Sequence, residues 1–152
     1  MDMKFSLDLP RETLSIPVIR RVLGDTLRGL GVSEACIADL LVAASEACTN
    51  VVQHVDSASH YEVIASIAGD HCVLKVADTG HGFRSDAEKN AGLDSESGRG
   101  IKIMRALVDD VTFDSRPDTG TVVYLQKRLS WQEESPMRFL EPQLLKTAGS
   151  AS

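Results

Sequence analysis

The segment from residue 33 to residue 55 most constrains how this chain can fold, because its apolar residues recur with the period of a helix. Ser33 stands directly before it, and serine at such a position caps a helix by accepting a backbone hydrogen bond. The apolar positions are Ile37, Leu40, Leu41, Ala44, Cys48, Val51, Val52 and Val55. A long helix with one apolar face packs that face against another layer, so the sequence predicts a central amphipathic helix in a layered fold.

Alternating apolar residues and turn residues predict the other elements. Strands are expected over residues 3–9, 61–67, 73–77, 111–115 and 121–127, and further helices over about 15–31 and 100–109. Gly69-Asp70 turns the chain between the second and third strands. This order predicts an α+β sandwich, with helices on one face of a mixed, mostly antiparallel sheet.

Length and composition indicate one folded domain. The chain has 152 residues, of which 43% are hydrophobic and 25% charged, as in ordinary globular proteins. The domain is expected over residues 1–130. After that the composition shifts toward polar residues, so residues 131–152 are expected to form a poorly ordered C-terminal tail.

Charge and cysteine content exclude some classes of function. A net charge of −6 argues against direct binding of nucleic acid, which needs a basic surface. Cys36, Cys48 and Cys72 lack metal-ligand spacing and are expected to be reduced core residues. We find neither a signal peptide nor a run of 18 apolar residues, which predicts a cytoplasmic protein without a membrane segment.

Three short segments carry candidate chemistry. Glu46 and Asn50 lie four residues apart on the central helix, so both project from one face, nearly opposite its apolar stripe. Alone, such a pair is typical of a solvated helix face. Ala43 and Ala47 flank the pair, however, and allow a close approach to the helix. Carboxylate and amide oxygens also suit a magnesium ion or an attacking hydroxyl group.

The other two segments are rich in glycine. Asp78-Thr-Gly80-His-Gly82 follows a strand; this is typical of a tight turn, but it also lets an aspartate meet an amino group above bare backbone. Gly98-Arg99-Gly100-Ile101 opens a helix after a long polar loop. Free backbone N–H groups at a helix start bind phosphate well, and Arg105 follows on the same helix.

Taken together and in this order, the motifs resemble those of the GHKL ATPase superfamily. The set is E-x-x-x-N on a helix, D-x-G-x-G after a strand, a long loop, G-x-G at a helix start, and Gly120-Thr121 entering the last strand. Two segments are similar to those of the anti-sigma-factor serine kinases: Ala44-Ser-Glu-Ala-Cys-Thr-Asn50 and Gly98-Arg-Gly-Ile101. The resemblance covers about residues 5–129 and implies the Bergerat-type ATP-binding two-layer sandwich.

The resemblance also implies a role for each motif residue. Glu46 would be the base or the orienting residue for the partner hydroxyl, Arg105 would neutralise charge on the transferred phosphoryl group, and Asn50 would hold Mg²⁺ against the ATP phosphates. Residues 84–97 would form a lid. The nucleotide would be bound by Asp78 at the adenine amino group and by Gly80, Gly82, Gly98, Arg99, Gly100, Ile101 and Thr121 around it.

The partners implied are an alternative sigma factor, which the protein inhibits, and a STAS-domain anti-anti-sigma protein, which it phosphorylates on serine or threonine. A homodimer is also implied. Two alternatives stay open on the residues alone. One is a binding module that uses ATP only to order its partner surface; retention of Glu46 and Arg105 argues against it. The other is the catalytic fragment of a histidine kinase, against which stands the lack of a preceding helix pair with a phosphoacceptor histidine.

Overall fold

The structure is a computed structural model that describes residues 2–54, 60–78, 98–116 and 120–133. Its elements follow one another as β1 (Asp2–Pro10), α1 (Ser15–Leu30), α2 (Glu34–His54), β2 (His60–Ala68), β3 (His71–Asp78), α4 (Gly98–Leu107), β4 (Asp110–Arg116) and β5 (Gly120–Arg128). The expected elements are all present. Helix α4 begins two residues earlier than expected, so Gly98 and Gly100 lie inside its first turn, and it ends at Leu107 because β4 starts at Asp110.

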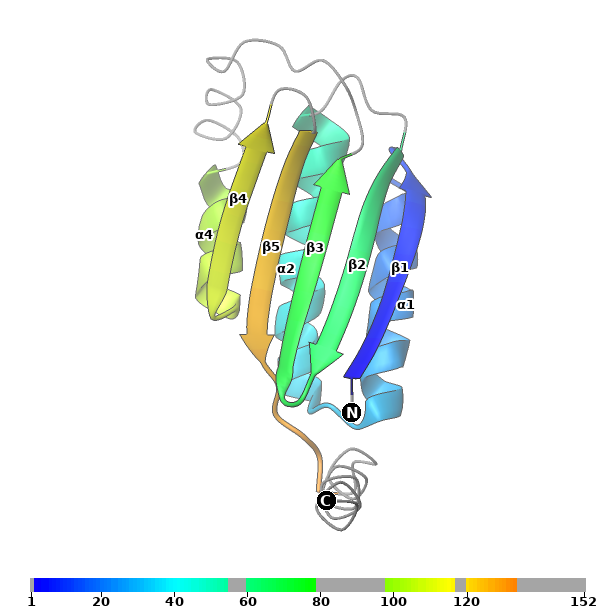
Figure 1. Cartoon of the computed structure of the whole chain (residues 1–152), viewed down its shortest axis with the longest axis vertical. Helices are drawn as coiled ribbons and strands as arrows, with labels where there is room; N and C mark the ends of the chain where they lie inside the picture. The colour runs from blue at the N-terminus through cyan, green and yellow to red at the C-terminus, as the bar shows by residue number, and fades with distance from the viewer. Residues whose placement is uncertain (1, 55–59, 79–97, 117–119, 134–152) are drawn as a thin grey trace, which may run out of the picture.

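The strands form one sheet in the order β1-β2-β3-β5-β4, and each neighbouring pair is antiparallel. Helices α1, α2 and α4 lie on the same side of this sheet, as Figure 1 shows. The expected α+β two-layer sandwich is therefore confirmed, and the sheet is antiparallel throughout the part that the structure describes.

Local sequence accounts for the ends of the elements. Gly31 has φ of 86°, and the N–H groups of Gly31 and Val32 bond to the carbonyls of Arg28 and Leu27, which ends α1 in a Schellman motif. The Ser33 hydroxyl accepts a hydrogen bond from the Cys36 N–H at 3.3 Å and caps α2, as expected. Gly69, with φ of 60°, makes the tight turn between β2 and β3.

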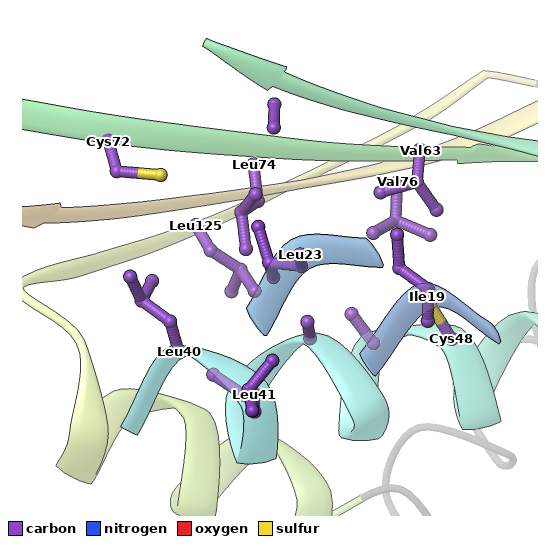
Figure 2. Packing of buried hydrophobic residues seen from close by; sticks show 14 of the residues in the cluster. Ile19, Leu23, Leu40, Leu41, Cys48, Val63, Cys72, Leu74, Val76 and Leu125 are labelled. Carbon is purple, nitrogen blue, oxygen red and sulfur yellow. The ribbon is translucent and has the colours of Figure 1, made fainter. Parts of the chain in front are cut away.

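The core lies between the helices and the sheet. Figure 2 shows side chains of α1 and α2, including Ile19, Leu23 and Leu40, pointing toward those of the strands. Every second residue of β2 and β3 is buried on this side. The three cysteines are buried and unpaired, which confirms the expectation for them.

Helix α2 occupies the centre of the helix layer. It packs against α1 on one side and α4 on the other, and also touches the sheet. By length and composition alone, Glu34–Gln53 is apolar enough to cross a membrane, with a mean hydropathy of 1.5. Residues such as Ala44, Ala47 and Cys48 are fully buried within the fold, so this composition is that of a core helix.

The chain after β5 runs beneath the turn between α1 and α2. Trp131 forms an isolated β-bridge with Val32, and the Gln132 N–H donates to the Gly31 carbonyl at 2.8 Å. Trp131 also packs against the core. The domain boundary expected between residues 130 and 131 stays a prediction, and residues 134–152 lie outside the described part.

Candidate nucleotide-binding and catalytic site

The candidate site lies at one end of the sandwich, where α2 and β3 end and α4 begins (Figure 1). Helix α4 packs antiparallel to α2, so the first turn of α4 lies beside the C-terminal half of α2, near Glu46 and Asn50. Ala43 and Ala47 of α2 are fully buried. Small side chains at these positions let the two helices approach closely, as the sequence suggested.

Glu46, Asn50 and Gly100 meet across this seam between the helices. A methyl group placed on the Gly100 Cα would lie 2.9 Å from Glu46 Oε2 and 3.7 Å from Asn50 Oδ1. Both polar side chains of α2 therefore point toward the backbone at the start of α4. The N–H groups of a helix's first turn have no partner inside the helix and carry partial positive charge. The seam thus combines a carboxylate, a carboxamide and an anion-binding helix end.

Asn50 has hydrogen-bonding capacity left for a ligand. Its Nδ2 atom is buried and has no hydrogen-bond partner among the described residues. A buried amide nitrogen without a partner costs free energy unless a ligand or water satisfies it. A Cβ at Gly100 would also fill the space beside Asn50. The residues at this seam therefore fit a nucleotide whose phosphates, with their metal ion, lie against α2 and the start of α4.

A second group of residues forms the floor of the site on the sheet. Asp78 is the last residue of β3, is 1% exposed, and has Tyr61 of β2 as its register partner. On the other side, Ala77 pairs with Val122, so Thr121 stands one residue further on, beside Asp78. Burial alternates along β3 and β5, and both Asp78 and Thr121 belong to the helix-covered set. The floor is thus Tyr61, Asp78 and Thr121 in a row.

The remaining predicted residues are placed as follows. Gly98 begins α4, Arg99 is exposed, and Ile101 is half-buried against the core. Arg105 is exposed in the last turn of α4. It stands about 7.5 Å further along the helix axis than Gly100 and about 140° around it, so it is not brought to the seam with Glu46. Gly80, Gly82 and the segment 84–97 lie outside the described residues.

Sequence reasoning missed Tyr61 and Ser15, whose hydroxyl oxygens are 2.5 Å apart. In the sequence, Tyr61 is only the first of four alternating residues whose other members are aliphatic. One signal was available: a buried tyrosine hydroxyl needs a hydrogen-bond partner, so a tyrosine on an aliphatic face predicts a polar contact there.

Comparison with known proteins identifies the family of the chain. The histidine kinase-like ATPase domain family matches residues 9–127, and the chain belongs to this family. The class that the fold and the seam define is therefore that of an ATP-using enzyme domain.

The chain is similar, more narrowly, to the serine-protein kinase RsbW. It is 33% identical over 134 residues to RsbW of Bacillus licheniformis, covering 80% of this chain and 82% of that protein. It is 30% identical over 138 residues to RsbW of Bacillus velezensis, covering 82% and 84%. Within its family the chain is thus a protein serine/threonine kinase of the RsbW group, which confirms the resemblance.

A solved structure supports the fold. The crystal structure of the RsbU and RsbW domains of a Mycobacterium tuberculosis protein superposes with a TM-score of 0.68 at 24% identity, covering 86% of this chain. This chain spans 33% of that two-domain chain.

Proposed function

We propose that this protein is an anti-sigma factor that binds Mg-ATP and transfers the γ-phosphoryl group to a serine or threonine of a STAS-domain anti-anti-sigma protein. It binds and inhibits an alternative sigma factor, and it changes partner as the STAS protein is modified. The observation that carries the proposal is the seam at which Glu46 and Asn50 meet the backbone of Gly100.

Each residue of the seam has a defined task in this reaction. Glu46 accepts the proton of the partner's hydroxyl group while the hydroxyl oxygen bonds to the γ-phosphorus. The bond from that phosphorus to the bridging oxygen breaks, and ADP leaves with the electron pair. The N–H groups of Gly98, Arg99 and Gly100 hold phosphate oxygens at the start of α4. Positioning and charge neutralisation supply most of the catalysis in phosphoryl transfer.

Asn50 is the protein ligand for Mg²⁺ in this proposal, through its Oδ1 atom. Among the described residues, no group of three or more His, Cys, Asp and Glu side chains could hold a metal ion. Proteins commonly give Mg²⁺ only one or two oxygen ligands, usually carboxylates, and substrate phosphates and water complete its coordination; here the Asn50 amide oxygen takes the place of the carboxylate. An ion held there would supply neutralisation of the charge that develops on the phosphate oxygens.

The floor of the site supplies recognition of the base. Asp78 accepts a hydrogen bond from the adenine amino group, and Thr121 and Ile101 line the pocket beside it. Gly80 and Gly82 shape the pocket, and residues 84–97 close over the nucleotide. The charge-neutralising role that the resemblance implies for Arg105 is not part of this proposal, because Arg105 is exposed and lies away from the seam. Asp78 is supported by its burial at the end of β3, next to Thr121.

The proposal includes a cytoplasmic homodimer joined through β1 and α1. Strand β1 pairs with β2 on one side and forms an edge of the sheet on the other. An open edge exposes unpaired N–H and C=O groups and is commonly covered by another chain. Sedimentation equilibrium tests this part separately, and a single species of 16.4 kDa would contradict it.

The test is transfer of γ-labelled phosphate from Mg-ATP to a panel of STAS-domain proteins from the source organism. Glu46→Ala removes the base and is expected to abolish transfer while ATP still binds. The matched control is Glu62→Ala, since Glu62 lies on the sheet face that the helices leave uncovered. The proposed kinase activity is supported if one serine or threonine of a STAS-domain protein is labelled by the wild type and by the control variant, but not by Glu46→Ala. ATP binding without any labelled partner would instead favour the non-catalytic binding module.

A further inference from the structure

Two consecutive hydrogen bonds join β2 to the start of α1 and the residues before it. The Ser15 hydroxyl donates to the Glu12 carbonyl at 2.6 Å and lies 2.5 Å from the Tyr61 hydroxyl. Tyr61 is fully buried and Ser15 is 4% exposed. The contacts therefore lie in the interior.

The direction of these two bonds follows from counting protons. A carbonyl only accepts, so the single hydroxyl proton of Ser15 goes to Glu12. Tyr61 must then donate to Ser15. Each of the two hydroxyl protons therefore has one place, and the bond to Ser15 limits the movement of the Tyr61 ring.

Tyr61 stands beside Asp78 in the sheet. The two residues are register partners on β2 and β3, and both face the helices. Side chains directly opposite each other on an antiparallel pair have Cβ atoms about 4.5–5.5 Å apart. Tyr61 is thus the neighbour of Asp78 on β2, and Thr121 is its neighbour on β5.

We propose that Tyr61 is a positioning residue for nucleotide recognition, and that its hydroxyl, fixed by Ser15, holds the wall against which Asp78 is aligned with the adenine amino group. This inference rests on the role proposed above for Asp78. It adds that selectivity for adenine depends on a hydroxyl that does not touch the nucleotide and that is anchored in the first turn of α1.

The test compares binding of ATP with binding of inosine triphosphate, which carries a carbonyl where adenine has its amino group. Calorimetry with Mg²⁺ gives both dissociation constants without requiring phosphoryl transfer. Tyr61→Phe keeps the ring and removes the hydroxyl. We expect it to weaken ATP binding by about three- to tenfold, as the loss of one hydrogen bond would, and to leave inosine triphosphate binding unchanged.

Two variants separate this idea from simpler ones. Ser15→Ala removes the anchor but leaves Tyr61 in place, and it is expected to reduce the preference for ATP in the same direction. Tyr124→Phe is the control, because Tyr124 is the other of the two tyrosines and lies on the uncovered face, near Lys75. It is expected to leave both dissociation constants unchanged.

Asp78→Asn distinguishes failure of the inference from failure of the proposed function. If Asp78→Asn leaves the preference for ATP intact, the role of Asp78 is wrong and the inference falls with it. If Asp78→Asn removes the preference while Tyr61→Phe lowers only the thermal stability, Tyr61 has a structural role and the inference alone is overturned. Loss of preference in Tyr61→Phe, Ser15→Ala and Asp78→Asn supports it.

Discussion

Replacing Gly100 with alanine tests the seam between α2 and α4 most sharply, because the new methyl group would point at the proposed base. Its carbon would lie 2.9 Å from Glu46 Oε2. Non-bonded heavy atoms prefer about 3.5–4.0 Å, so the carboxylate must retreat by about 0.6 Å or more. The contact with Asn50 Oδ1, at 3.7 Å, is ordinary and requires no movement.

The expected effects on stability and on catalysis differ. Alanine is about 0.5–1 kcal/mol better than glycine inside a helix, and turning Glu46 away from its preferred rotamer costs a similar amount. The free energy of unfolding should therefore change by less than about 1 kcal/mol. A shift of this size at a reacting group lowers kcat by about ten- to a hundredfold.

The assay is phosphoryl transfer to the STAS partner at saturating ATP, alongside urea unfolding of the same preparation. Gly29→Ala is the matched control, because Gly29 is also helical and a Cβ there meets no atom within 4 Å. The control should gain about 0.5–1 kcal/mol without any loss of kcat. Normal kcat in Gly100→Ala would refute the placement of Glu46 at the reacting hydroxyl. Loss of several kcal/mol in stability would refute the idea that only a flexible side chain has to move.

Two further predictions concern groups away from the seam. Burial raises the pKa of the Cys48 thiol to about 12, against the opposing effect of its hydrogen bond to Tyr61, and burial raises the pKa of Cys72 to about 12. Both thiols should stay unlabelled by iodoacetamide at pH 8 until the protein is unfolded, and rapid labelling of the native protein, read by mass spectrometry, would contradict this. At Asp70, desolvation raises the pKa, but the combined effects of His71 and Arg128 outweigh it, so the pKa lies below its ordinary value. Because its pKa is lower in the folded state, Asp70 stabilises the fold at pH values above its unfolded-state pKa of 3.8, and this contribution is lost as the pH falls. Asp70→Asn should therefore lower the free energy of unfolding at pH 7 and have less effect on it near pH 2. An equal effect at both pH values, measured by urea unfolding, would exclude this contribution.

Local patterns in the sequence predicted the parts of the site that lie within one element. The four-residue spacing of Glu46 and Asn50 is enough to place both on one face of α2, because the helical period fixes it. The cap at Ser33 and the turn at Gly69 follow from single residues in the same way.

Contacts between distant segments could not be predicted by such patterns. Glu46 and Gly100 belong to different helices, and the apolar period of each helix does not say which other helix it packs against. Their close approach depends on where α4 lies after β3. The hydroxyls of Ser15 and Tyr61 lie 46 residues apart in the chain. Alternation predicts which face of β2 Tyr61 occupies, but not which side chain meets it there.

The position of β1 at the sheet edge has a consequence for synthesis of the protein. The partner of Pro10 is His60, so 50 residues must be added before this end of the ladder can close. At about 5–20 residues per second, a ribosome needs about 3–10 s for that stretch. During this time β2, the strand that will pair with β1, has not yet been synthesised. Polar and charged residues such as Lys4, Ser6 and Asp8 alternate with its apolar ones, and they keep the waiting strand from pairing with other nascent chains.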